Sequence, residues 1–209
     1  MQAASPILLS REKAGEEVAL FTMQPAFHIR PAKPQDAEAI LITHRKAIRT
    51  KAAPHYSPEI IAEWASEITP KKIDEQSQEL KDPGVVCLVA EDSTGVFGFA
   101  TAILNQEELR AVYVAPNPHP GVGAALLKNL EKLCTERGCK KLQMDASINA
   151  ESFYNRHGYQ SLEHGTHILR SGNGLSFEVN FLLNDCCFAI IKISSKLSNY
   201  SYGSAKTFG

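Results

Sequence analysis

The segment from Leu109 to Leu133 constrains the fold of this chain more than any other. It opens with an apolar run of strand length that ends at Val114, and it continues through a loop with three prolines and two glycines. Apolar residues then recur at helical spacing before Gly138 supplies a helix stop; they are Val122, Leu126, Leu130 and Leu133. The pattern predicts a strand, a loop and a helix in direct succession.

The start of this predicted helix is a candidate anion-binding site. The first backbone N–H groups of a helix have no partner inside it, and glycines let a phosphate group approach the backbone closely. Gly121, Val122, Gly123 and Ala124 would offer such donors. The alternative is a tight turn in which the glycines only adopt positive φ. Nucleotide and dinucleotide loops are excluded, since no Lys-Ser or Lys-Thr follows Gly123 and the six-residue glycine pattern is absent.

Periodicity and turn chemistry predict the other elements. Strands are expected over 27–30, 85–90, 96–104, 141–145, 159–163, 166–170 and 177–183, with the second and third forming an antiparallel hairpin. Helices are expected to begin at Pro34, Ser57-Pro58 and Thr69-Pro70, and a short one to span 150–157 with Asn149 as its cap. A mixed sheet with helices on both faces covers this much apolar strand surface, so we expect an α/β fold of the α+β type.

Length and composition limit the classes of function. A chain of 209 residues suits one domain with a full core, and we expect an arm over 1–25, the domain over 26–183 and a tail over 184–209. A net charge of −1 favours neither nucleic acid nor an anionic membrane as a partner. No apolar run is long enough to span a membrane and no secretory signal is visible, so we expect a cytoplasmic protein.

Five cysteines are present, and they include no Cys-x-x-Cys pair. We expect Cys87, Cys134 and Cys139 to be reduced core residues, and we expect no metal site, because no histidine and carboxylate cluster has a convincing ligand spacing. The apolar run over 186–193 suits an extra edge strand or a contact in a homodimer.

A second motif is more specific than the first. The segment 149–159 reads Asn-Ala-Glu-Ser-Phe-Tyr-Asn-Arg-His-Gly-Tyr. It resembles the Asn-Ala-x-x-Phe-Tyr-x-x-x-Gly-Tyr/Phe motif of the GNAT superfamily of N-acetyltransferases, and 109–127 resembles the strand, loop and helix with which that superfamily binds pyrophosphate. The resemblance covers about 27–183. Pro118 stands where family members usually carry Gln or Arg, and neither it nor Pro120 has an N–H to donate.

The resemblance implies a mostly antiparallel sheet that is splayed at its middle, with acetyl-CoA as cosubstrate. Its pantetheine arm would lie between strands 109–114 and 141–145, bound by backbone groups of Val112 and Val114 and by the side chain of Asn149. Its diphosphate would meet the amides of 121–124. Tyr56 lies in the region that walls the acceptor pocket in this superfamily and is our candidate for substrate contact.

Acetyl transfer from a thioester to an amine needs a base for the amine and a proton for the thiolate. Tyr154, at the motif position, resembles the proton donor; the alternative is an amphipathic core residue. Glu108 and His167 are candidate bases, although an exposed edge glutamate and a structural histidine are the ordinary explanations. His119 lies in the predicted phosphate loop, where it would pair with phosphate.

The leading hypothesis is therefore an acetyl-CoA-dependent N-acetyltransferase that acts by direct attack of a small-molecule or peptide amine. The alternatives are a non-catalytic acyl-CoA-binding or regulatory module and a plain structural domain. The sequence does not identify the acceptor.

Overall fold

The computed structural model describes residues 27–116, 119–169 and 176–185. They form a mixed sheet in the order β1-β2-β3-β4-β5-β7-β6, in which every neighbouring pair is antiparallel except β4 and β5. The strands are β1 (His28–Pro31), β2 (Val85–Asp92), β3 (Gly95–Ile103), β4 (Glu108–Val114), β5 (Lys141–Ser147), β6 (Gln160–Ile168) and β7 (Ser176–Asp185). The expected fold class is confirmed.

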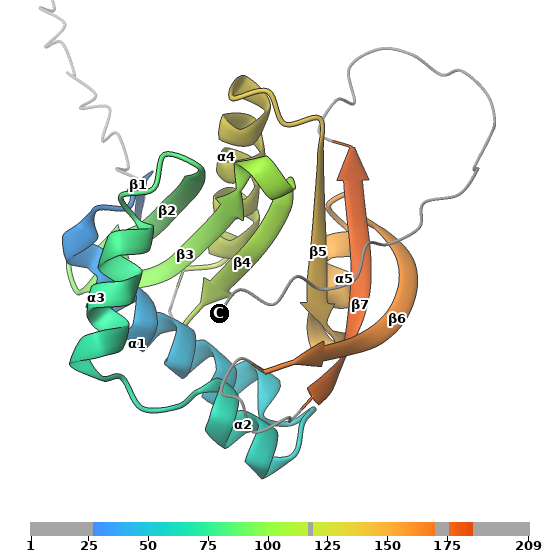
Figure 1. Cartoon of the computed structure of the whole chain (residues 1–209), viewed down its shortest axis with the longest axis horizontal. Helices are drawn as coiled ribbons and strands as arrows, with labels where there is room; N and C mark the ends of the chain where they lie inside the picture. Colours follow the sequence, from blue (N-terminus) through green and yellow to red (C-terminus); the bar gives the residue numbers. More distant parts are fainter. Residues whose placement is uncertain (1–26, 117–118, 170–175, 186–209) are drawn as a thin grey trace, which may run out of the picture.

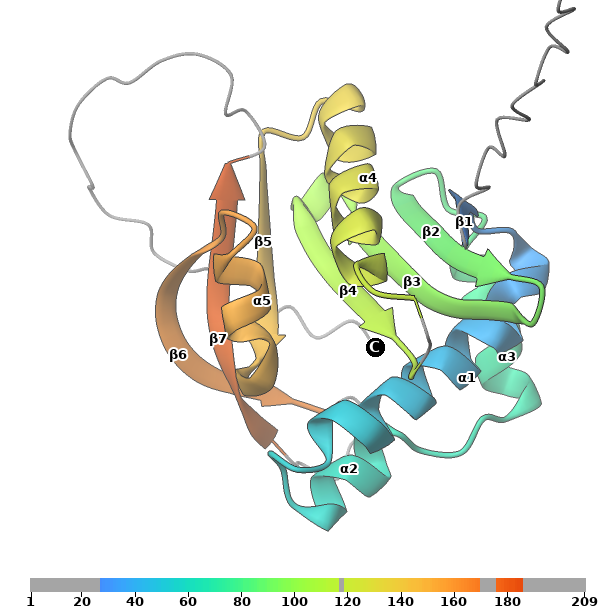
Figure 2. The same cartoon turned by 180° about the vertical axis from the view of Figure 1, so that it is seen from behind.

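Helices cover both faces of the sheet (Figures 1 and 2). On one face lie α1 (Ala37–Ala47), α2 (Pro58–Trp64) and α3 (Pro70–Glu79), and on the other lie α4 (Val122–Glu136) and α5 (Glu151–Asn155). A π-helical segment, Ile48–Ala52, continues α1. Within the described residues, none of the helices combines the length and the apolar character that a membrane crossing requires.

The helix boundaries follow from local chemistry. Ser57 accepts a hydrogen bond from the Ile60 amide at the start of α2, and Thr69 accepts one from Lys72 at the start of α3. A proline occupies the first position of each of these two helices, as expected. Gly138, just after α4, has φ 91°, which an L side chain rarely adopts, so it ends the helix as expected.

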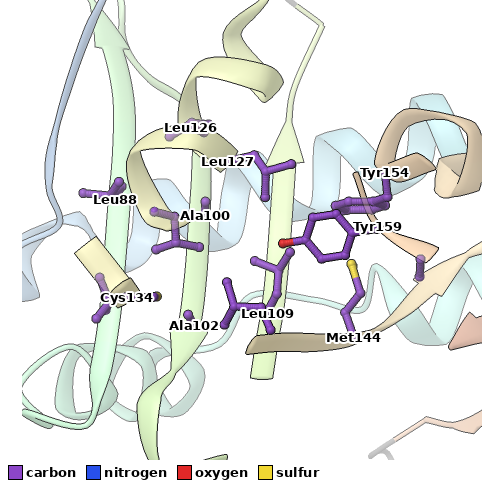
Figure 3. Close-up of a cluster of buried hydrophobic side chains, with 14 of the residues drawn as sticks. Leu88, Ala100, Ala102, Leu109, Leu126, Leu127, Cys134, Met144, Tyr154 and Tyr159 are labelled. Carbon is purple, nitrogen blue, oxygen red and sulfur yellow. The ribbon is translucent and has the colours of Figure 1, made fainter. Parts of the chain in front are cut away.

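The larger core lies between the sheet and α4. Leu126, Leu127 and Leu130 of α4 are fully buried there, together with Leu142 of β5 (Figure 3). The cysteines at 87, 134 and 139 are buried and form no disulfide, as the sequence predicted, while those at 186 and 187 lie outside the described residues. Burial of these apolar side chains is the main source of stability for the domain.

The two strands predicted over 159–163 and 166–170 are wrong as separate elements, because β6 is one strand that runs through Gly165. Glycine is needed at this point of the strand, because a Cβ atom on Gly165 would overlap the ring of Phe181 on β7. This glycine therefore marks a close approach between strands and not a turn. β7 extends to Asp185, just beyond the predicted domain boundary.

An ion-paired cluster links β1 to β2 and to the turn before α1, and we expect its contribution to stability to depend on pH. Arg30 bonds Asp36 at 2.7 Å and Glu91 at 2.7 Å, and the Arg30 guanidinium holds the pKa of Asp36 below its ordinary value. Asp36→Asn should lower the free energy of unfolding by about 1 kcal/mol at pH 7. Because the folded-state pKa is depressed, this contribution is present above the unfolded-state pKa and is lost as pH falls below about 4.

Urea denaturation of wild type and Asp36→Asn at a series of pH values checks this expectation. Glu38→Gln, which changes an exposed carboxylate in the first turn of α1, is the matched control and should have little effect. A difference in the free energy of unfolding between wild type and Asp36→Asn that stays constant down to pH 2 would contradict the expected pH dependence.

Candidate active site

β4 and β5 begin side by side and then separate (Figure 1). Within the described residues the two strands pair at one position, Glu108 with Gln143, where the Gln143 amide donates to the Glu107 carbonyl at 2.9 Å. Beyond this point β4 stays paired with β3, and β5 pairs with β7. The second backbone edge of β4 is thus left without a partner strand, as the expected splay requires. Val112 and Val114 lie along this edge.

A β-bulge changes the direction of the side chains on β4. Ala102 of β3 pairs with Leu109, whereas the preceding Thr101 pairs with Ala111, so Arg110 is the extra residue. As a result Leu109 packs in the core cluster with α4, and Ala111 packs in the cluster of the opposite face. A regular strand would have placed both on one face.

The start of α4 carries no side-chain cap. Gly121 occupies the cap position with φ 81°, a conformation that favours glycine, whereas α2 and α3 are capped by hydroxyls. The amides of Val122, Gly123 and Ala124 occupy the first turn, where a helix leaves its N–H groups without internal partners. Gly123 faces the ring of Phe153, at 3.5 Å from the Cβ position that a side chain would take. Pro118 lies outside the described residues.

Asn149 does not cap α5, which corrects the prediction. It lies inside a 3-10 turn, Ile148–Ala150, and the cap positions of this turn and of α5 are Ser147 and Ala150. The Asn149 Oδ1 atom is buried and has no hydrogen-bond partner among the described residues. A buried amide oxygen without a partner costs free energy, so an N–H group from a ligand would suit this position. The amides of a pantetheine arm offer such a donor, and this part of the chain therefore fits the cosubstrate.

Tyr154 lies on α5 in the core that faces the gap. Figure 3 shows its ring beside that of Tyr159, and both belong to the core cluster that includes Leu109 of β4 and Met144 of β5. The side chain is 3% exposed, and this burial raises its pKa above the ordinary value for a phenol. The hydroxyl therefore stays protonated at neutral pH, as a proton donor must. Its role in proton transfer stays a prediction.

A cavity of about 580 Å³ opens on the side of the sheet that carries α1, α2 and α3. Its walls come from both strands of the gap, with Glu108 and Arg110 from β4 and Asp145 and Ser147 from β5. Leu109 of β4, which packs with the α4 core, is among its lining residues too. Two predicted candidates, Glu108 and His167, are brought together in this cavity.

Glu108 is occupied by an ion pair. Its two carboxylate oxygens accept hydrogen bonds from Arg110 at 3.3 and 3.1 Å, and Arg110 also bonds Glu79 of α3 at 2.7 Å. The guanidinium stabilises the ionised carboxylate and competes for its lone pairs. These bonds make Glu108 a weaker candidate for accepting a proton from an amine.

His167, near the end of β6, meets a carboxylate that the sequence analysis missed. Its Nδ1 atom lies 3.1 Å from Oδ2 of Asp145, and the two side chains are 39% and 42% exposed. Asp145 lies on β5, and β7 separates the two strands in the sheet. The alternation of 141–145 placed Asp145 on the polar face of its strand, but no local signal indicated its partner.

A second histidine, His44 of α1, also lines the cavity. Its ring meets the ring of Tyr113 edge-on with centroids 4.6 Å apart. Burial lowers the pKa of His44 to about 4, so the imidazole is neutral at pH 7. The sequence analysis assigned no role to this residue.

Two other predicted residues have partners within the fold. The Nε2 atom of His119, which the sequence analysis expected to pair with phosphate, lies 2.9 Å from Oδ2 of Asp92. The His119 ring packs against the ring of Phe97. The Tyr56 hydroxyl donates to the Glu178 carbonyl at 3.0 Å and accepts from the Ile148 amide at 2.8 Å. Its contact with substrate stays a prediction. In the part of the chain that the structure describes, no three metal-ligating side chains gather.

A sheet opened between two parallel strands, with an uncapped helix start behind it and a lined cavity in front, is the arrangement that the resemblance to acyl-CoA N-acyltransferases implies. The family model described as an acetyltransferase (GNAT) domain matches residues 52–172, which is more than half of the chain. The chain therefore belongs to the GNAT acetyltransferases and is an acyltransferase of this family, which uses acetyl-CoA.

Individual relatives agree with this assignment. The uncharacterized N-acetyltransferase YafP of Escherichia coli K12 is 32% identical over 136 residues, which cover 65% of this chain and 82% of YafP. A GCN5-related N-acetyltransferase from Rhodopseudomonas palustris is 28% identical with a TM-score of 0.66, covering 76% of this chain and 94% of its own. PaiA N-acetyltransferase from Thermoplasma acidophilum, solved with coenzyme A, shares the fold at 20% identity and a TM-score of 0.60, covering 76% and 98%.

Proposed function

We propose that the protein transfers the acetyl group of acetyl-CoA to a primary amine by direct attack. The observation that carries this proposal is the divergence of β4 and β5 from a single paired position, beside a cavity that residues of both strands line. A thioester in this gap would present its carbonyl carbon to an amine in the cavity. The pantetheine arm would use the open edge of β4 and the Asn149 oxygen, and the diphosphate would use the first turn of α4.

His167 is the base in this proposal, because the carboxylate of Glu108 is held by Arg110. The amine gives up a proton to the imidazole as its nitrogen forms a bond to the thioester carbon. The carbon–sulfur bond then breaks, and Tyr154 donates a proton to the departing thiolate. The products are an acetylated amine and CoA, and solvent returns the proton to the tyrosine and removes the one on the histidine.

Calorimetric titration with CoA and acetyl-CoA, followed by a thiol-release assay over a broad panel of amines, tests the proposed function. We expect binding of both cosubstrate forms and turnover with a subset of amines. Binding without turnover on the whole panel would instead support an acyl-CoA-binding module. Absence of binding would overturn both.

Tyr154→Phe should lower kcat by about tenfold or more, because a phenyl ring cannot give a proton to the thiolate. The affinity for acetyl-CoA should be nearly unchanged, since only the hydroxyl is lost. Steady-state thiol release and calorimetry measure the two quantities. Tyr159→Phe is the matched control, because it removes a hydroxyl from the adjoining ring. An unchanged rate at saturating amine would remove Tyr154 from the mechanism.

A further inference from the structure

The contact between His167 and Asp145 spans a strand. Asp145 lies on β5 and His167 on β6, while β7 lies between these strands in the sheet. The ring atom Nδ1 is nevertheless 3.1 Å from Oδ2 of the carboxylate. Both side chains line the cavity that residues of β4 and β5 share. A contact between two strands that are not neighbours in the sheet depends on the shape of β6.

Two features of β6 allow the contact. The strand curves strongly along its length, so that its end crosses toward the helices at the base of the sheet (Figures 1 and 2). Gly165 also leaves room for Phe181, the β7 neighbour of Asp145, to lie directly against β6. A side chain at 165 would clash with this ring and force it to move.

We propose that Asp145 is a positioning residue that holds His167 in the tautomer with the proton on Nδ1, so that Nε2 accepts the proton of the attacking amine. This inference rests on the proposed function. A carboxylate that accepts a hydrogen bond from one ring nitrogen fixes the ring orientation and makes the other nitrogen the acceptor. The same carboxylate stabilises the imidazolium that forms when the amine proton arrives.

The two cations near the pair are bound to other groups. The titratable side chains around the pair are Glu108 and Arg110 on β4, His44 on α1, Glu63 on α2, Lys72, Glu75 and Glu79 on α3, and Glu163 on β6. Arg110 is bound by Glu79 and Glu108, and the Lys72 ammonium donates to Ser66 at 2.7 Å. Neither of these cations is therefore engaged with Asp145.

Asp145→Asn should lower kcat/KM by about 10- to 100-fold, as loss of an orienting carboxylate does at other sites. Asp145→Glu should recover part of the rate, and Asp74→Asn, which changes an exposed carboxylate of α3, should leave kcat/KM unchanged. A rate within twofold of wild type in Asp145→Asn would overturn the proposal.

Nitrogen-15 NMR of the His167 ring gives a readout that does not depend on turnover. We expect the Nδ1–H tautomer in the wild-type protein at alkaline pH and a shift toward the Nε2–H tautomer in Asp145→Ala. The same tautomer in both proteins would overturn the proposal. Loss of transfer in His167→Gln with a fully active Asp145→Asn would overturn the positioning role alone. Binding of acetyl-CoA without any turnover would overturn the proposed function, while the ring spectrum still decides whether Asp145 sets the tautomer.

Discussion

His167→Gln should lower kcat by about 10²- to 10³-fold, the range for loss of a general base. Glutamine approximates the size and polarity of the imidazole and cannot take up a proton at neutral pH. The dissociation constant of acetyl-CoA should be unchanged, since the cosubstrate is expected on the α4 and α5 side of the gap. Stopped-assay thiol release at saturating amine measures kcat, and calorimetry measures the affinity.

His164→Gln is the matched control for this experiment. His164 is an exposed histidine on the same strand. It pairs with Asn180 of β7, and Asn180 in turn pairs with the core residue Ala146 of β5. It therefore lies on the face opposite the cavity, and its replacement should leave kcat unaltered. If His167→Gln retained the wild-type rate, the base would have to be sought elsewhere in the cavity, with Glu108 as the remaining candidate.

Gly165→Ala should destabilise the protein by about 1 to 3 kcal/mol, because the added methyl group overlaps the ring of Phe181. The loss should be smaller in a Phe181→Leu background, where the side chain is shorter and can withdraw. A double-mutant cycle from urea denaturation measures this coupling. Equal costs of Gly165→Ala in both backgrounds would show that the ring does not set the requirement for glycine.

Much of the fold follows from local signals in the sequence. The starts of α2 and α3 are encoded by Ser57-Pro58 and Thr69-Pro70, where a hydroxyl cap and a proline act within one turn. Gly138 ends α4 by the same kind of local preference. The wrong prediction of a break in the strand at Gly165 has a different origin, because glycine is required there by Phe181, a residue on another strand. Sequence spacing alone does not distinguish a turn from such a close approach.

The candidate site is harder to predict from the sequence, because its residues come from different strands and only the folded sheet brings them together. His167 and Glu108 could be proposed as single residues, but the bulge at Arg110 and the curve of β6 decide what each of them contacts. Asn149 shows how a shift of one or two residues changes a contact: as a cap its oxygen would be satisfied, whereas inside the 3-10 turn it has no hydrogen-bond partner among the described residues.

The parting of β4 and β5 creates a strand edge in the interior of a sheet. Such an edge normally invites pairing with another chain, and here helices on both faces restrict access to it. A ligand whose amide groups bond there would act as a missing strand, and its binding free energy would add to the free energy of unfolding. The cosubstrate would then contribute to the stability of the fold whenever it is bound, and the protein would be most resistant to denaturation in its acetyl-CoA complex.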